Sequence, residues 1–101
     1  MGLPLEILAP FEKRLPLLAE YIGTFLLTLA YLSTTNLLII GAIFLSILFL
    51  IIPISGGCLN PVITCVMYLN GKLGKIETLL YIIMQFLAGT TSFYLYNILQ
   101  G

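Results

Sequence analysis

Apolar residues form three stretches that are each long enough to cross a lipid bilayer, and short polar or glycine-rich segments separate them. No Asp, Glu, Lys or Arg occurs between residues 21 and 71. A bilayer core about 30 Å thick needs roughly 20 helical residues. The pattern predicts three membrane-spanning helices, at about 15–33, 37–52 and 76–99. Pro53 is expected to end the second, because proline disfavours helix at the preceding residue.

The segment between the second and third spans predicts a short helix. Ser55, Gly56 and Gly57 disfavour helix, whereas Asn60 followed by Pro61 is typical of a helix start. A helix over about 60–69 would be about 15 Å long. It would reach only halfway through the bilayer core, so the pattern predicts a re-entrant half-helix. Irregular backbone at that depth is tolerated only where protein or a water-filled cavity satisfies its polar groups, which indicates function.

The first fourteen residues depart from the apolar pattern. Residues 1–14 include two prolines and two glutamates and end in the Lys13–Arg14 pair. They lack the apolar run and small-residue cleavage site of a signal peptide. We expect an interfacial leader over 1–14 and one membrane domain over 15–101.

Composition places the chain among membrane proteins. Of its 101 residues 60% are hydrophobic and 8% are charged, so we expect an all-α integral membrane protein in contact with the lipid bilayer. Four basic and four acidic residues leave no net charge, and nothing in the sequence favours a nucleic-acid partner. The chain has no histidine, and Cys58 and Cys65 are not in metal-ligand spacing. We expect no metal, no cofactor and no enzymatic activity, because no nucleophile and base can be paired inside the membrane.

The basic residues predict an orientation. If the amino terminus is cytoplasmic, two spans bring the chain back to that side, so that Lys13, Arg14, Lys72 and Lys75 all face the cytoplasm. The positive-inside rule therefore favours a multi-pass protein with a cytoplasmic amino terminus. The half-helix would then enter from the cytoplasmic side with its amino end at the midplane.

Three segments resemble one family of channels. SGGCLNPVIT, residues 55–64, resembles the SGGHxNPAVT box of the aquaporin and glycerol-facilitator family, with Cys58, Val62 and Ile63 as the departures. AEYIGTFLLTL, residues 19–29, is similar to the family's first-helix signature, and YIIMQFLAG, residues 81–89, is similar to its third-helix signature. The three segments correspond to the first half of such a channel. The resemblance implies half of an aquaporin-like fold, with three spans and one re-entrant half-helix.

The resemblance also implies roles for individual residues. The expected pore-lining or solute-contacting residues are Gly56, Gly57, Cys58, Asn60, Pro61, Val62 and Ile63, together with Ile40 at the second-helix filter position. Glu20 would brace the re-entrant loop by accepting backbone hydrogen bonds, and Gln85 would steady the half-helix, with Thr64 as a further support. On residue chemistry alone, Glu20 could instead lie near the headgroups, and Gln85 could simply bond to a neighbouring helix.

A half-helix terminus at the midplane has a definite chemistry. Its unsatisfied N–H groups carry about half a positive charge, which repels cations and protons. A neutral solute could accept a hydrogen bond from the Asn60 amide and donate to backbone carbonyls over 56–58. We therefore expect a passive pore for water or small neutral solutes such as glycerol.

One half cannot enclose such a pore alone. The second half could be a complementary chain, or the chain could be the front piece of a split or truncated channel. An inverted copy of the chain is the next alternative, although the charge bias argues against it, and higher oligomers are possible. With Ile40 and Ile63 at the filter, a pore made of two copies would be apolar and lack a cation. The different functional class is a non-conducting membrane interaction protein.

Overall fold

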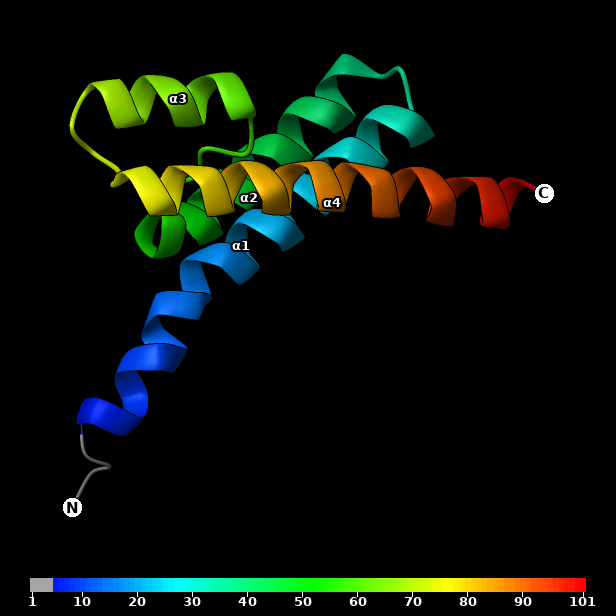
Figure 1. Cartoon of the computed structure of the whole chain (residues 1–101). Helices are drawn as coiled ribbons and strands as arrows, with labels where there is room; N and C mark the ends of the chain where they lie inside the picture. The colour runs from blue at the N-terminus through cyan, green and yellow to red at the C-terminus, as the bar shows by residue number, and fades with distance from the viewer. Residues whose placement is uncertain (1–4) are drawn as a thin grey trace.

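The computed structural model describes residues 5–101, with side chains described from Arg14 onwards, and in this part of the chain all regular structure is helical. The helices are α1 (Leu5–Ser33), α2 (Leu37–Ser55), α3 (Pro61–Leu69) and α4 (Lys75–Gln100) (Figure 1). Arg14–Ser33 of α1, all of α2 and all of α4 are long and apolar enough to cross a membrane. The prediction of a helical chain with three such helices is confirmed.

The helix α1 starts earlier than predicted. It begins at Leu5 and continues without a break into the first span, whereas a separate leader was expected over 1–14. Pro10 lies inside α1 and does not end it. Residues 1–4 of the predicted leader lie outside the described residues.

The prediction that Pro53 ends the second span is wrong. The helix α2 includes Pro53 and continues to Ser55, so the missing N–H and the steric demand of the proline ring do not end it. The helix ends where a residue takes a positive φ. Gly56 has φ 89° and its N–H donates to the Ile52 carbonyl at 2.9 Å, which is the usual glycine termination of a helix.

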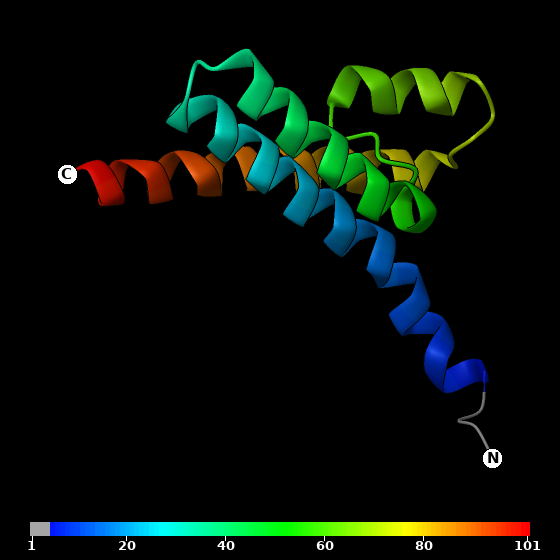
Figure 2. The same cartoon turned by 180° about the vertical axis from the view of Figure 1, so that it is seen from behind.

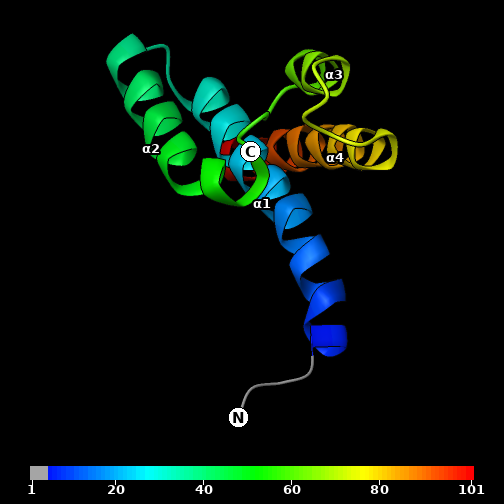
Figure 3. The ribbon, with the colours of Figure 1, turned by 90° about the vertical axis from the view of Figure 1, so that its left-hand side faces the viewer.

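The helices are arranged around α1 and α4. The helix α1 packs against both α2 and α4, and α3 packs against α4. Within the described helices, the backbones of α2 and α3 do not pack against each other, and Figure 3 shows the two helices diverging on either side of α1. The carboxyl-terminal part of α4 extends beyond the rest of the bundle in two opposite views (Figures 1 and 2).

A small apolar core fixes the loop between α2 and α3. Leu59 of this loop packs with Ala19 of α1 and with Ile47 and Ile51 of α2, and all four are buried. Gly23 makes the contact possible, since a Cβ at this position would lie 2.7 Å from Leu59 Cδ2 and 2.8 Å from Ile51 Cδ1.

We expect Gly23→Ala to destabilise the fold by about 1–2 kcal/mol, because the added methyl group overpacks this core. Gly41 on α2 provides the matched control, since a Cβ there would meet nothing within 4 Å. Gly41→Ala should be neutral or slightly stabilising. Reversible unfolding in mixed micelles measures the free energy of unfolding of both variants. Equal values for Gly23→Ala and Gly41→Ala would contradict the prediction.

Candidate functional site

The buried centre of the molecule is the carboxylate of Glu20, on α1. Its side chain is fully buried and accepts four hydrogen bonds. Oε2 accepts from Ser55 Oγ at 2.6 Å and from the Cys58 N–H at 3.2 Å. Oε1 accepts from the Leu59 N–H at 2.8 Å and from Gln85 Nε2 at 2.9 Å. The expected contact between Glu20 and the loop backbone is present, and the carboxylate is not at an exposed boundary.

The loop conformation directs two successive N–H groups at that carboxylate. Gly56 and Gly57 have positive φ values of 89° and 68°, which glycine adopts without strain. Leu59 also has a positive φ, 56°, which is uncommon for a residue with a branched side chain. The burial of its side chain and the hydrogen bond to Glu20 hold it there.

A second set of hydrogen bonds joins the loop and α3 to α4. Gln85 Nε2 donates to Thr64 Oγ1 at 2.7 Å as well as to Glu20, and Thr64 Oγ1 donates to the Asn60 carbonyl at 2.8 Å. Tyr81 OH donates to the Ser55 carbonyl at 2.9 Å. The expected supports Glu20, Gln85 and Thr64 are thus in direct contact. Tyr81 and Ser55 were missed, although both lie inside the segments that carry the resemblance.

The amino end of α3 is built as the Asn-Pro pair predicts. Asn60 has extended backbone (φ −150°, ψ 132°), and Pro61 is the first helical residue. Asn60 Oδ1 accepts from the N–H groups of Val62 at 2.7 Å and Ile63 at 3.4 Å. Because its oxygen is used in the cap, the exposed side chain presents its amide N–H donors outward.

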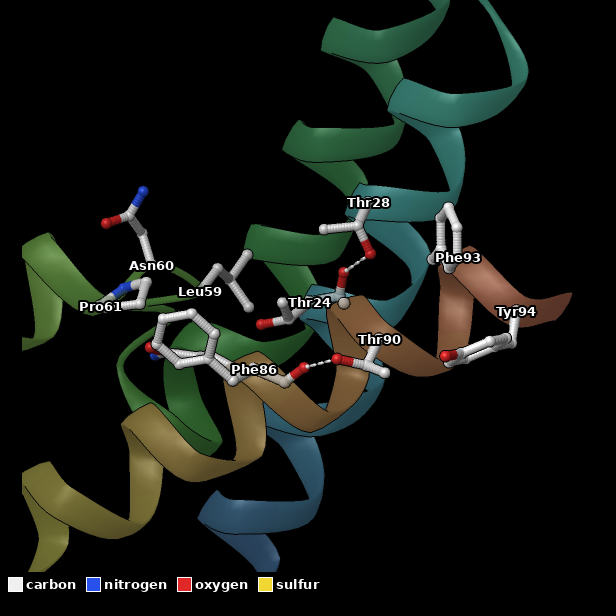
Figure 4. A pocket seen from close by; sticks show the side chains of 11 residues that line it. Thr24, Thr28, Leu59, Asn60, Pro61, Phe86, Thr90, Phe93 and Tyr94 are labelled. Carbon is white, nitrogen blue, oxygen red and sulfur yellow. Dashed lines mark hydrogen bonds between the residues drawn. The ribbon is translucent and has the colours of Figure 1, made fainter. Parts of the chain in front are cut away.

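Asn60 lies on the boundary between two recesses. The first, which we call the α2–α3 groove, measures about 300 Å³, and its lining includes Cys58, Asn60 and Ile63 together with Leu27, Tyr31 and Phe44. The second, which we call the α4 recess, measures about 500 Å³ and extends from Asn60 and Pro61 along α1 and α4 (Figure 4). The groove is the gap left where α2 and α3 diverge.

The other predicted pore residues do not all line the same hollow. Gly56 and Cys58 line a further recess of about 420 Å³ that also includes Lys72. Because Cys58 also lines the α2–α3 groove, it lies between the two hollows. Val62 is exposed and Ile40 is partly buried, and neither lines the groove, the α4 recess or the recess beside Lys72. The structure therefore does not place the Ile40 and Val62 side chains in the recesses that Asn60 lines, since α2 diverges from α3 and the Val62 side chain occupies another face of α3.

The site offers neutral hydrogen-bonding groups. Within the residues that the structure describes, no group of three or more His, Cys, Asp or Glu side chains could hold a metal ion. Cys58 is buried and Cys65 is exposed, and both are free thiols. The Glu20 carboxylate already accepts four hydrogen bonds, so the polar residues that line the groove are the neutral Asn60, Cys58, Thr28 and Tyr31, beside apolar side chains. Comparison of the chain with protein-family models, curated proteins and solved structures finds no match.

Proposed function

We propose that the chain is a half-channel subunit which, together with a second half, forms a passive pore for water or small neutral solutes such as glycerol. The observation that carries the proposal is the α2–α3 groove. The Asn60 amide, the Cys58 side chain and the amino end of a nine-residue helix meet in this hollow beside apolar walls. The three segments that resemble aquaporins and glycerol facilitators point to the same function.

In this proposal α3 is a re-entrant half-helix that ends near the membrane midplane. Nine residues reach about 14 Å, roughly half of the bilayer core. A loop at that depth needs protein partners for its polar backbone, and the hydrogen bonds from Cys58 and Leu59 to Glu20 meet this need. The fully buried Glu20 therefore supports the placement of the loop inside the membrane.

The groove would select against charge. The partial positive charge at the amino end of α3 disfavours cations and protons close to Asn60. A water or a polyol can instead accept a hydrogen bond from the Asn60 amide, and the carbon atoms of a polyol can contact Leu27, Phe44 or Ile63. Selectivity then follows from the width of the groove and the few groups that line it.

The groove is open along one side, and another half must close it. The complementary chain remains the preferred second half, and an inverted copy of this chain is the alternative. The cytoplasmic amino terminus is part of the proposal and follows from the positions of the four basic residues.

The proposal predicts that an indole placed in the groove blocks conduction. Stopped-flow light scattering on vesicles that contain only the purified chain measures water and glycerol flux against empty vesicles. If two copies of the chain enclose the pore, the unmodified chain gives flux several-fold above the lipid background and Ile63→Trp returns it to background, because the ring fills a groove of about 300 Å³.

Val62→Trp is the matched control, since Val62 is exposed on the adjacent position of α3 and does not line the groove. It should conduct like the unmodified chain. Equal flux from both variants would contradict the placement of the pore. An inserted, folded chain with only background flux would exclude a pore made by this chain alone, and would favour a complementary half or a non-conducting role.

A further inference from the structure

The α4 recess contains two buried polar atoms that nothing in the described part of the chain satisfies. These atoms are Thr24 Oγ1 and Gln85 Oε1, and their residues are 4% and 3% exposed. The Gln85 amide cannot be reversed, because its nitrogen donates to Glu20 Oε1 and Thr64 Oγ1. Unpartnered polar atoms are costly in an apolar surrounding, and lipid chains carry no donors. An occupant of this recess must therefore bring hydrogen-bond donors.

The surface around these atoms is suited to a helix. Gly89 lines the recess near the middle of α4, and a Cβ there would meet nothing within 4 Å. The exposed rings of Phe86 and Phe93 lie on either side of Thr90 along this face (Figure 4). Bare backbone between large side chains lets a neighbouring helix approach closely in a membrane.

We propose that the occupant is a second copy of this chain, packed across a twofold axis at Gly89 of α4. In such a contact the same surface is used on both subunits, so that a donor on one copy that meets an acceptor on the other makes the same hydrogen bond twice. This surface carries both: the Asn60 amide on the rim presents N–H donors, and Gln85 Oε1 on the floor lacks one. The hydrogen-bond donors that the recess needs are therefore present on the recess itself.

The contact is compatible with a single orientation of the chain in the membrane. Identical chains insert the same way round, so the axis lies along the membrane normal and pairs residues of similar depth. Asn60 also lines the α2–α3 groove, and its two N–H groups allow one to face the second copy and the other to face the groove. The inference does not depend on conduction, since the contact covers the α4 recess and the proposed pore runs in the groove, although Thr28, Leu59 and Asn60 line both.

The test is Förster transfer between donor-labelled and acceptor-labelled chains in phosphatidylcholine vesicles, with the protein-to-lipid ratio lowered in steps. The unmodified chain should associate well above the transfer expected from random proximity. Gly89→Leu should weaken association about tenfold or more, because the side chain blocks close approach. Gly41→Leu is the matched control, since Gly41 is equally open and lies on α2, outside the recess. It should associate like the unmodified chain.

A second variant tests the polar atoms. Thr24→Val keeps the side-chain shape and removes an unpartnered hydroxyl, so the single chain should stay folded while association weakens. Transfer at the random level, as expected if only a different chain or lipid covers the recess, would overturn the inference. So would equal association of the Gly89→Leu and Gly41→Leu variants. Association without solute flux would exclude a pore made by this chain alone and leave the dimer standing.

Discussion

Glu20→Gln is expected to lower the free energy of unfolding by about 3 kcal/mol. The carboxylate accepts four hydrogen bonds, two on each oxygen, and three of the donors come from the loop or its flanking Ser55. A glutamine offers one oxygen and one NH2 group, so two donors lose their acceptor. The least costly arrangement points the NH2 group at Ser55, whose hydroxyl can turn, but it still leaves the Cys58 N–H unpaired. The lost charge also weakens the remaining bonds, and together these effects give the estimate.

Reversible unfolding in mixed micelles with an anionic detergent measures this loss. Glu77→Gln is the matched control, because the Glu77 carboxylate is exposed and, among the residues whose side chains are described, accepts from only the Gly74 N–H at 3.1 Å. A glutamine can make the same bond, so the control should change stability by no more than about 0.5 kcal/mol. If both variants unfold like the unmodified chain, the carboxylate does not hold the loop.

The long helices and the short α3 were accessible from the sequence because local rules decide them. Hydropathy alone identifies helices that could cross a membrane, and an Asn-Pro pair marks the start of α3. The local rule was wrong at Pro53. Proline disfavours helix at the residue before it, but Pro53 lies inside α2. The end of α2 is decided three residues later by the positive φ of Gly56.

The partners of Glu20 depend on tertiary structure and could not be read from residue spacing. A buried carboxylate needs donors, but the physical argument does not say which ones. The resemblance predicted that the loop backbone donates to Glu20 and that Gln85 supports the half-helix. The structure adds Ser55 as a donor to Glu20, and it shows the positive φ of Leu59. Ile40 shows the opposite case. The resemblance predicted Ile40 at the filter position of the pore, but the divergence of α2 from α3 keeps its side chain out of the groove.

Asn60→Asp is expected to reduce the flux of neutral solutes about fivefold while the fold stays intact. Aspartate caps helices as well as asparagine does, so its carboxylate can still accept from the Val62 and Ile63 N–H groups. It carries no N–H, so a solute in the groove loses a hydrogen bond worth about 1 kcal/mol, and the new negative charge binds cations at the same place. Proteoliposome flux of water, glycerol and Na⁺ checks both effects.

Asn36→Asp is the matched control, because Asn36 caps α2 in the same way, at 2.9 Å from the Leu38 N–H, and lies outside the groove. Flux and ion selectivity that match the control would mean that Asn60 does not contact the solute, and that its role is only to begin α3.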